Sequence, residues 1–228
     1  MEKRVRTRLW ELGCRSYREV WEMQERFFEE ARKVKEAGKP AVNRLLFVEH
    51  DPVYTLGKSG NEDNMLLDAV RLRTRHVELL RVDRGGDITF HGPGQWVVYP
   101  IIDLEQFGLG VKDYVYCLEE VVIRAIARYG IRGERLAGAT GVWVEPNTPR
   151  ARKICAIGVK CSRHMTMHGL ALNVNTDLRY FNYIHPCGFV DKGVTSVSKE
   201  TGGKELSMME VREFLLRSFE EVMGMVFV

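Results

Sequence analysis

The chain has 228 residues, a net charge of +3 at pH 7, 45% hydrophobic residues and 29% charged residues. This composition is typical of a folded soluble protein, and no apolar run approaches the ~20 residues that a membrane-spanning helix needs. Basic and acidic residues are interspersed, which argues against a protein that binds nucleic acid. No secretory signal is recognisable, so we expect a cytoplasmic location, no membrane association and a single domain over residues 1–228.

The cysteines give a second indication of the compartment. They are five in number and lie far apart, without the close pairs of a disulfide scaffold: Cys14, Cys117, Cys155, Cys161 and Cys187. This spacing predicts reduced thiols in a reducing compartment.

The first predicted element is a helix that begins after Ser16, where Glu19 completes the spacing of a capping box. It ends at Gly38 and Pro40, and its apolar face is predicted to consist of Tyr17, Val20, Trp21, Phe27, Phe28, Ala31 and Val34. Four apolar or alternating runs then predict strands at 45–49, 53–57, 87–90 and 96–104.

A second helix is predicted from about Lys112 to Tyr129, with Gly130 as its stop. Three further strands follow at 141–144, 153–162 and 169–175, and the loop 145–152 is expected to join two adjacent strands. The last helix begins at Ser207, with Glu210 three residues later. Because strands outnumber helices and follow one another directly, the fold class is predicted as α/β (α+β), with a mixed, largely antiparallel sheet flanked by helices.

The segment RGGDITFHGPGQ, residues 84–95, places four glycines and a proline around Arg84 and His91. Glycines of this kind let the backbone approach a ligand closely. We therefore predict a ligand-binding loop, with a plain hairpin turn as the alternative.

The segment KICAIGVKCSR, residues 153–163, has the alternation of a strand. Lys153 and Cys155 are predicted to share one face, and Ala156 and Gly158 the other. The second face is nearly bare, so either a neighbouring helix or an acyl chain is expected to fill the space above it.

In the segment HPCGF, Cys187 stands between Pro186 and Gly188, in a turn that could present its thiol to a substrate. A buried structural cysteine is the alternative. A metal site is not predicted: His164 and His168 have helical i, i+4 spacing, but Met165 stands where a zinc protease needs glutamate, and the surrounding pattern is that of a strand.

Together these segments resemble the lipoyl(octanoyl) transferase family, the octanoyl-acyl carrier protein:protein N-octanoyltransferases. The resemblance begins near Tyr17 and Gln24, spans most of the chain, and includes DPVYTLGKS, RGGDITFHGPGQWVVYPIIDL, KICAIGVKCS, MHGLALNVNTDL, PCGF and VTSVSKE. The combination of RGG, HGPGQ, HGLALN and PCG is much more specific than any one of these motifs.

This resemblance implies that Cys187 is the acyl-thioester nucleophile and Lys153 its catalytic partner. It also implies a fold like that of the biotin and lipoate protein ligases. The octanoyl pocket is expected to be lined by Arg84, Gly85, Gly86, Asp87, Ile88, Thr89, Phe90, His91, Ala156, Ile157, Gly158, Gly169, Leu170 and Ala171. Three residues depart from the usual pattern: Asp87 stands in place of glutamine, Phe90 in place of tyrosine and Cys155 in place of alanine. His91 is expected to orient the loop or Cys187.

The implied reaction takes the octanoyl group from octanoyl-acyl carrier protein to a lysine of a lipoyl domain, with no cofactor or metal. The acceptors would be 2-oxoacid dehydrogenase E2 subunits and the glycine cleavage H protein. Candidate contacts to the acidic carrier protein are Lys58, Arg71, Arg73, Arg75 and Lys160. Three alternatives are an ATP-dependent lipoate protein ligase, which needs no cysteine, a noncatalytic acyl-binding protein and a thiol hydrolase.

Overall fold

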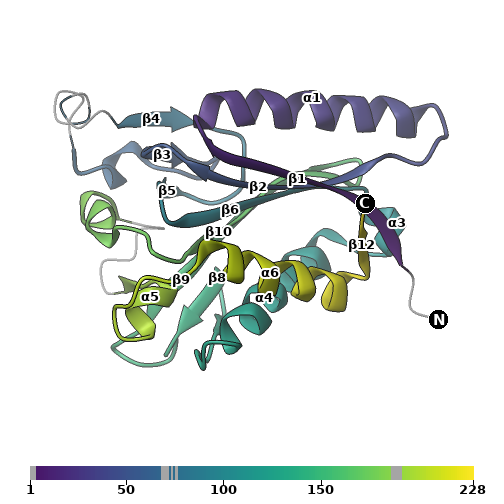
Figure 1. Cartoon of the computed structure of the whole chain (residues 1–228). Coiled ribbons are helices and arrows are strands. Elements are labelled where there is room, and N and C mark those ends of the chain that lie inside the picture. The colour runs from purple at the N-terminus through teal and green to yellow at the C-terminus, as the bar shows by residue number, and fades with distance from the viewer. Residues whose placement is uncertain (1–3, 68–71, 73, 75–76, 186–191) are drawn as a thin grey trace.

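The computed structural model of the chain describes residues 4–67, 72, 74, 77–185 and 192–228. Within these residues, nine strands form one mixed sheet in the order β12-β1-β2-β6-β10-β9-β8-β7, with β11 paired to β9 (Figure 1). The strands are β1 (Val5–Arg15), β2 (Asn43–His50), β6 (Gln95–Ile101), β7 (Glu134–Leu136), β8 (Ala139–Val144), β9 (Arg152–Ser162), β10 (Met165–Asn173), β11 (Gly193–Val194) and β12 (Met225–Phe227).

Most neighbours in this sheet are antiparallel, from β2 through β6, β10, β9 and β8 to β7. Parallel pairs occur where β1 meets β2 and β12, and where β11 meets β9. The described strands thus confirm the predicted mixed, largely antiparallel sheet. The loop 145–152 does join two adjacent strands, since β8 and β9 are antiparallel neighbours.

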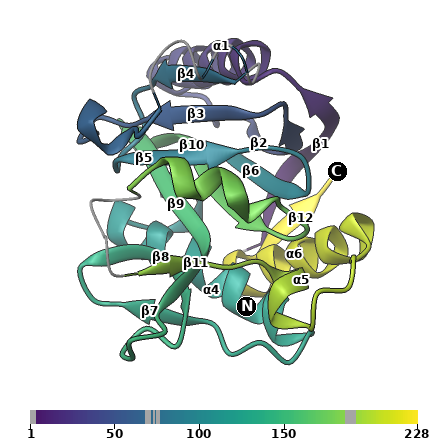
Figure 2. The ribbon, with the colours of Figure 1, turned by 90° about the vertical axis from the view of Figure 1, so that its left-hand side faces the viewer.

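A smaller sheet has the order β4-β3-β5, from β3 (Val53–Leu56), β4 (Glu78–Arg81) and β5 (Ile88–His91). Its strand β3 pairs in parallel with β4 and antiparallel with β5. Figure 2 shows this sheet beside the start of α1, on the same side of the large sheet as that helix. The predicted ligand-binding loop therefore runs from the small sheet, through β5, into β6 of the large sheet.

Helices cover both faces of the large sheet. The long α1 (Tyr17–Glu36) covers one face, and α4 (Val111–Ala127) and α6 (Met208–Met223) cover the other (Figures 1 and 2). Two shorter helices, α3 (Leu104–Phe107) and α5 (Val197–Glu200), and the 3-10 helices Glu62–Asn64 and Leu178–Tyr183 lie in the connections. Within the described part of the chain, no helix combines the length and the apolar character that crossing a membrane would require.

Both predicted capping boxes form their first hydrogen bond. The backbone amide of Glu19 donates to the Ser16 hydroxyl at 3.3 Å, and the amide of Glu210 donates to the Ser207 hydroxyl at the same distance. Each bond satisfies an amide that has no partner within the first helical turn. The caps therefore explain why α1 and α6 begin where the sequence predicts.

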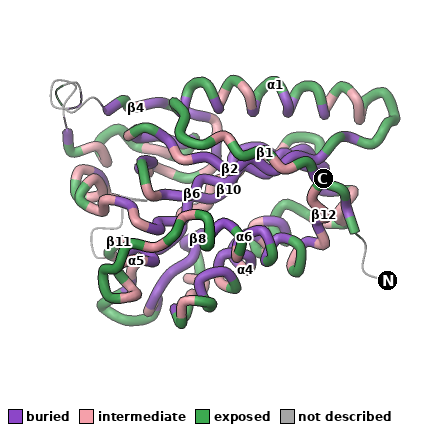
Figure 3. The backbone as a smooth tube through the Cα atoms, in the orientation of Figure 1, coloured by how far each residue is buried: buried purple, intermediate pink, exposed green. Residues whose placement is uncertain are grey.

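The central strands are buried on both faces (Figure 3). In β2, Leu45 and Phe47 pack in a cluster with α4 and α6, whereas Leu46 and Val48 pack in a second cluster with α1. This follows from the two-residue repeat of a strand, which sends successive side chains to opposite faces. A third cluster lies around the small sheet and contains Phe90.

Candidate active site

One cavity of about 290 Å³ lies between α1, the small sheet and strands β9 and β10. It is lined by Lys153 and by all of the predicted acyl-pocket residues except Gly85 and Phe90. The structure therefore brings together three segments that are far apart in sequence, although their role in binding an acyl chain remains a prediction. The sequence analysis did not assign to it the other lining residues: Tyr17, Gln95, Val97, Tyr99, Gly138, Ala139, Thr140, His168, Asn173, Phe181 and Val194.

Gly85 and Phe90 belong to the same loop but have other contacts. The amide of Gly85 donates to the carbonyl oxygen of Val159 at 3.0 Å, which fixes the loop against β9. The Phe90 ring is buried and stacks on Tyr180, with ring centroids 4.4 Å apart. These two residues therefore hold the loop in place behind the cavity wall.

The face of β9 that was predicted to carry little side-chain bulk is found at Ala156 and Gly158, and both residues line the cavity. A Cβ atom on Gly158 would come within 2.6 Å of the Gly85 carbonyl oxygen. The loop at Arg84 and Gly85 therefore approaches the sheet as closely as it does only because residue 158 has no side chain. Part of the space above the face is filled by this loop, and the remainder is the cavity.

The prediction that Lys153 shares a face with Cys155 is wrong, because Lys153 lines the same cavity as Ala156 and Gly158. The register against β8 shows why: Val142 is opposite Cys155, whereas the next residue, Trp143, is opposite Lys153. Two residues of β9 thus advance against one residue of β8. This is a β-bulge at Ile154, and the extra residue reverses the alternation of side chains between the two parts of the strand, so that Lys153 and Cys155 point to opposite faces.

The ammonium group of Lys153 is held at the cavity by two described contacts. Its Nζ donates to the carbonyl oxygen of Thr140 at 3.2 Å and lies 4.7 Å from the centre of the Trp143 ring. Gly141 has φ +123°, and a Cβ there would lie 2.5 Å from the Cys155 carbonyl oxygen. The glycine thereby allows β8 to follow the bulge that directs Lys153 into the cavity.

Cys187, the predicted nucleophile, lies outside the described residues, as do Arg71, Arg73 and Arg75. The chain after Cys187 is described again from Lys192, and β11 then pairs in parallel with β9, so that Val194 is opposite Lys153. The amide of Thr195 donates to the Lys153 carbonyl oxygen at 2.9 Å. The described segment that follows Cys187 is therefore hydrogen-bonded directly to the strand that carries Lys153.

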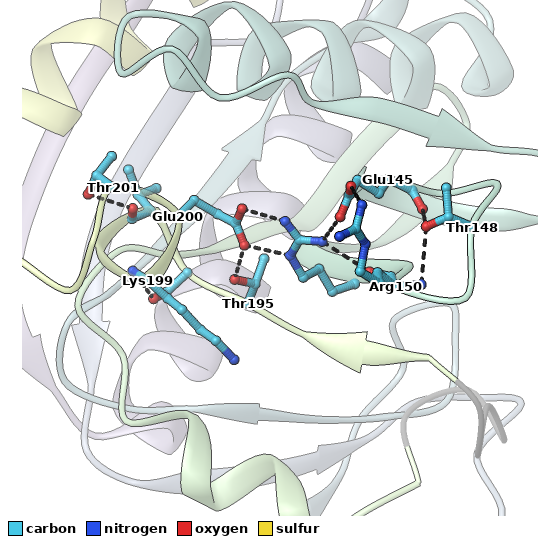
Figure 4. Close-up of polar contacts among 10 residues, drawn as sticks. Glu145, Thr148, Arg150, Thr195, Lys199, Glu200 and Thr201 are labelled. Carbon is cyan, nitrogen blue, oxygen red and sulfur yellow. Dashed lines mark hydrogen bonds and ion pairs between the residues drawn. The ribbon is translucent and has the colours of Figure 1, made fainter.

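An ion-pair network fastens this junction (Figure 4). Arg152 donates two hydrogen bonds to Glu200, each 2.6 Å long, and also pairs with Glu145 on the loop after β8. The Thr195 hydroxyl donates to Glu200 as well. The hydrogen bonds from Arg152 hold the pKa of Glu200 below its ordinary value of 4.5. The network thus links β8, β9, β11 and α5 next to Lys153.

Aromatic rings and histidines gather at the other end of the cavity. Tyr17 stacks on His91 with centroids 5.6 Å apart, and His50 and Tyr99 lie beside them. His91 bonds through Nδ1 to Gln95 at 2.8 Å and through Nε2 to Thr55 at 3.3 Å. Burial lowers its pKa well below 6.5. His91 therefore holds the loop as a neutral ring, which agrees with its expected orienting role.

Arg84 and Asp87 also fasten the loop. The Arg84 side chain is buried and donates to the carbonyl and hydroxyl oxygens of Thr55 and to the Gly85 carbonyl. Asp87, one of the departures from the family pattern, accepts hydrogen bonds from the Asn61 amide and the Asn64 side chain. Its carboxylate therefore connects the ligand-binding loop to the helical turn Glu62–Asn64.

His164 and His168 do not form a helical pair, since His168 lies in strand β10, which confirms the predicted strand pattern although β10 begins at Met165, four residues before the predicted start at 169. His164 is exposed, whereas His168 is buried and lines the cavity. The backbone amide of His168 donates to Oε1 of Gln24, a fully buried side chain of α1 that the apolar pattern of the helix missed. Tyr17, Gln24 and His168 all lie in segments that carry the family resemblance, and this was the available signal.

Comparison with known proteins gives the family. The model of the lipoyl protein ligase A/B catalytic domain matches residues 16–220. An octanoyltransferase of Bacteroides fragilis is 58% identical over 208 residues, covering 91% of this chain and 93% of that protein. An octanoyltransferase of Christiangramia forsetii is 48% identical over 228 residues, covering 97% of each chain.

A solved structure gives the same fold from a distant sequence. The bipartite lipoate protein ligase of Thermoplasma acidophilum superposes with a TM-score of 0.72 at 17% identity, covering 98% of this chain and 86% of that one. The predicted lipoate protein ligase-like fold is therefore confirmed. The chain belongs to the lipoyl protein ligase A/B catalytic domain family and, within it, to the octanoyltransferases, which are acyltransferase enzymes.

Proposed function

We propose that this protein moves the octanoyl group of octanoyl-acyl carrier protein, through a thioester on Cys187, to the lysine amine of lipoyl-domain proteins. The observation that carries the proposal is the position of Lys153, whose side chain reaches a cavity walled by Ala156, Gly158 and Ala171. An apolar slot with an amine at one end fits an acyl chain whose carbonyl carbon reacts beside that amine.

The described cysteines support Cys187 as the nucleophile by contrast. Burial is the main cause that raises the pKa of Cys14, Cys117, Cys155 and Cys161, so each stays a neutral thiol near pH 7. A neutral thiol is a poor nucleophile. Cys187 precedes Gly193 by six residues, and β11, which begins at Gly193, is hydrogen-bonded to the Lys153 strand.

The first half-reaction exchanges one thioester for another. The Cys187 thiolate attacks the octanoyl carbonyl carbon, the bond to the carrier sulfur breaks, and the carrier thiolate takes a proton from the Lys153 ammonium. A cation beside a cysteine lowers the thiol pKa by roughly 1–3 units and so increases the thiolate fraction. Because nucleophilicity falls with the pKa, the net gain in rate is about tenfold.

The second half-reaction makes an amide. The acceptor lysine amine attacks the Cys187 thioester, the carbon–sulfur bond breaks, and the neutral Lys153 amine takes the proton that the new amide nitrogen loses. Thiolate and ammonium are thereby restored for the next cycle. A residue that donates a proton in one step and accepts it in the next explains why one amine suffices.

The cavity also supplies binding energy. Burying the eight-carbon chain contributes on the order of 5 kcal/mol, at ~0.8 kcal/mol per methylene. This energy is available to a chain that fills the slot and is lost by degrees as the chain shortens. The length preference should therefore be graded.

The proposed partners follow from the same reaction. The acceptors are the lipoyl domains of 2-oxoacid dehydrogenase E2 subunits and the glycine cleavage H protein. The exposed Lys58 is available to the acidic carrier protein, whereas Lys160 is paired with Asp83 and makes a weaker candidate. We also propose a single catalytic domain over residues 1–228, acting in the cytoplasm, where thiols stay reduced.

Intact mass after incubation with octanoyl-acyl carrier protein tests this proposal. We expect one octanoyl adduct on the wild-type protein and none on Cys187→Ser. Cys161→Ser, at a half-buried thiol on β9, is the matched control and should keep the adduct. Addition of a lipoyl domain should then remove the adduct and acylate the domain.

The alternatives predict other results in the same assay. A lipoate protein ligase would modify the lipoyl domain only from free lipoate and ATP. A thiol hydrolase would release free octanoate, and a noncatalytic binding protein would leave the domain unmodified. An adduct that survives in Cys187→Ser would move the nucleophile to another residue.

A further inference from the structure

A second pocket, of about 460 Å³, adjoins the cavity. Phe181 and Val194 line both spaces, so the two meet at these side chains. Val194 is opposite Lys153 in the register of β11 against β9. This outer pocket, which is lined by Leu66 and by residues from 178–185 and 192–199, therefore begins at the Lys153 end of the cavity.

One wall of the outer pocket is fixed by backbone hydrogen bonds. The amide of Leu66 donates to the Tyr183 carbonyl oxygen at 2.9 Å, and the amide of His185 donates to the Asn64 carbonyl oxygen at 2.8 Å. This wall is therefore preformed, as is usual for sites that bind small molecules. The volume of the outer pocket also falls in the range of such sites, roughly 300–1,000 Å³.

The lining of the outer pocket combines apolar and basic side chains. Leu66, Phe181 and Ile184 are among the apolar ones, and the cationic ones include Lys192 and Lys199. None of the described lining residues is an aspartate or a glutamate. Such a surface suits a ligand that has an apolar part and an anionic end.

Lys199, in α5, is the cation best placed to bind an anion. It is exposed and forms no ion pair among the described residues. Figure 4 shows its side chain directed away from the Glu200 carboxylate, which is already paired with Arg152. Arg179, by contrast, is paired with Asp177 at 2.7 Å. Of these cations, Lys199 therefore has its charge available for a ligand.

The proposed reaction brings a ligand of this kind to the Lys153 end of the cavity. A carrier protein holds its acyl thioester on a phosphopantetheine arm, which has two amides, a pair of methyl groups and a phosphodiester where it joins the protein. When the octanoyl chain fills the cavity and its carbonyl carbon lies beside Lys153, the arm must leave at that end. The outer pocket begins there.

The length of the arm agrees with this path. From sulfur to phosphorus the arm has about 13 bonds, or about 16 Å when extended at ~1.2 Å per bond. Lys199 follows Val194 by five residues, so their Cα atoms lie at most about 18 Å apart. The long lysine side chain shortens the remaining gap. A phosphate at the end of the arm can therefore reach the Lys199 ammonium group.

We propose that the outer pocket binds the phosphopantetheine arm of the donor, with the methyl groups against Leu66 and Phe181 and the phosphate beside Lys199. This inference rests on the proposed octanoyl transfer. It adds a recognition site for the part of the donor that is not transferred. The source of the arm is the carrier protein.

Octanoyl thioesters of phosphopantetheine and of pantetheine, which lacks the phosphate, test the site without a carrier protein. We expect kcat/KM for transfer to a lipoyl domain to be about tenfold higher with the phosphate, the contribution of one charge-assisted hydrogen bond. Equal values would overturn the proposal. If neither these donors nor octanoyl-acyl carrier protein is used, the proposed function fails instead.

Substitution of Lys199 tests where the phosphate lies. Lys199→Gln should lower the ratio of the two kcat/KM values to about two, and Lys199→Glu should lower it below one because the carboxylate repels the phosphate. Lys204→Gln, at an exposed lysine outside the outer pocket, is the matched control and should keep the ratio near ten. A ratio that stays near ten in Lys199→Glu would place the phosphate elsewhere and refute the site.

The apolar part of the outer pocket has its own test. Octanoyl-N-acetylcysteamine lacks the methyl groups of the arm, so the preference for octanoyl-pantetheine over this donor should fall several-fold in Leu66→Asn. Leu66 and Val111 are 46% and 43% exposed, and Val111→Asn, on α4, should leave the preference unchanged. An unchanged preference in Leu66→Asn would contradict the proposed position of the methyl groups.

Coenzyme A separates the two sources of the arm, because it attaches the same arm to a nucleotide. Lys199→Gln should lower kcat/KM for octanoyl-coenzyme A and for octanoyl-acyl carrier protein by the same factor. The wild-type protein should use the carrier protein more efficiently, since that partner makes further contacts. A preference for octanoyl-coenzyme A would show that the carrier protein is not the source of the arm.

Discussion

Next to Lys153 the cavity is fastened by the Arg152–Glu200 ion pair, whereas at its other end the buried rings of His50 and His91 are fastened by neutral hydrogen bonds. Around Lys153, the Arg152 and Glu200 side chains keep 23% and 13% of their surface exposed. Around the inner end, His50 and His91 are at most 5% exposed, and both nitrogens of each ring are paired. Salt should therefore weaken the interactions next to Lys153 more than those at the histidine end, and mild acid should do the opposite.

This difference suits the two tasks of a transferase cavity. In the proposed reaction, the Lys153 end admits a carrier protein and a lipoyl domain in turn, and ion pairs near the surface can exchange partners with water at low cost. In the same proposal, the inner end contacts the acyl chain, and a preference for chain length requires walls that do not move. Buried and fully paired polar groups supply that rigidity.

The largest effect should come from removing the amine at the reacting end. Lys153→Met keeps the aliphatic stem over Trp143 but eliminates the ammonium, and should lower octanoyl transfer by about 100-fold or more. Rapid-quench measurement of the adduct and of the acylated lipoyl domain would show the loss in both half-reactions. Thermal stability should change little.

Lys153→Arg separates the two roles of the amine, because arginine keeps the positive charge but cannot act as a base. Adduct formation should survive in part, while transfer to the lipoyl domain should fall as far as in Lys153→Met. If Lys153→Arg transfers the group as fast as the wild type, the proton transfer in the second half-reaction is not carried by Lys153.

The parts of the fold that depend on local interactions could be predicted from the sequence, whereas those that depend on distant interactions could not. Ser16 and Ser207 predict where their helices begin, because a capping hydrogen bond joins two residues that are three positions apart in the sequence. The parallel pairing of β1 with β12 joins the two ends of the chain and has no local signal. Strand β11 has only two residues, Gly193 and Val194, too few for a periodic pattern.

The site divides in a similar way. The motifs predicted that Arg84, His91 and Gly158 line one cavity, because each of these residues lies in a segment that carries the family resemblance. The face of Lys153 was mispredicted because the bulge at Ile154 arises from pairing with β8. His168 has a positive φ, and its amide is held by Gln24, which lies 144 residues away in the sequence. The periodicity of apolar residues along the sequence gives no information about contacts between residues so far apart.

The second largest effect concerns the inner end and pH. Burial lowers the pKa of His50 from 6.5 to about 4. Between these two values the unfolded chain binds a proton that the folded protein excludes, so the free energy of unfolding falls as the pH drops from 6.5 to 4. The loss from this one ring is about 3 kcal/mol. Urea unfolding at intervals across this range measures it.

His50→Gln removes one titrating ring and should reduce this dependence, with the remainder due to the buried rings of His91 and His168, although it also lowers stability at pH 7 by disturbing the Tyr99 bond. His164→Gln, at an exposed histidine, should leave the slope unchanged. A wild-type slope identical to that of His50→Gln would mean that His50 is not held neutral by burial.

The smallest effect belongs to the ion pair at the reacting end. In a cycle of Arg152→Gln, Glu200→Gln and the double variant, we expect a coupling of about 1 kcal/mol in the free energy of unfolding. Octanoyl transfer should fall several-fold in each single variant, because β11 is then less firmly fixed beside Lys153. Arg150→Gln, at an exposed arginine paired with Glu145, is the matched control and should show neither effect.

Salt and pH separate this contribution from that of the histidines. The coupling should shrink in 1 M salt, where charges on partly exposed groups are screened over ~3 Å, whereas the His50 slope should persist. Because the pKa of Glu200 is held below 4.5, its ionised form stabilises the fold above that pH, and the contribution is lost only as the pH falls further. The histidine end thus weakens first on acidification and the lysine end second. A coupling insensitive to both salt and acid would show that Arg152 and Glu200 act through packing, and the contrast between the two ends would then have to be abandoned.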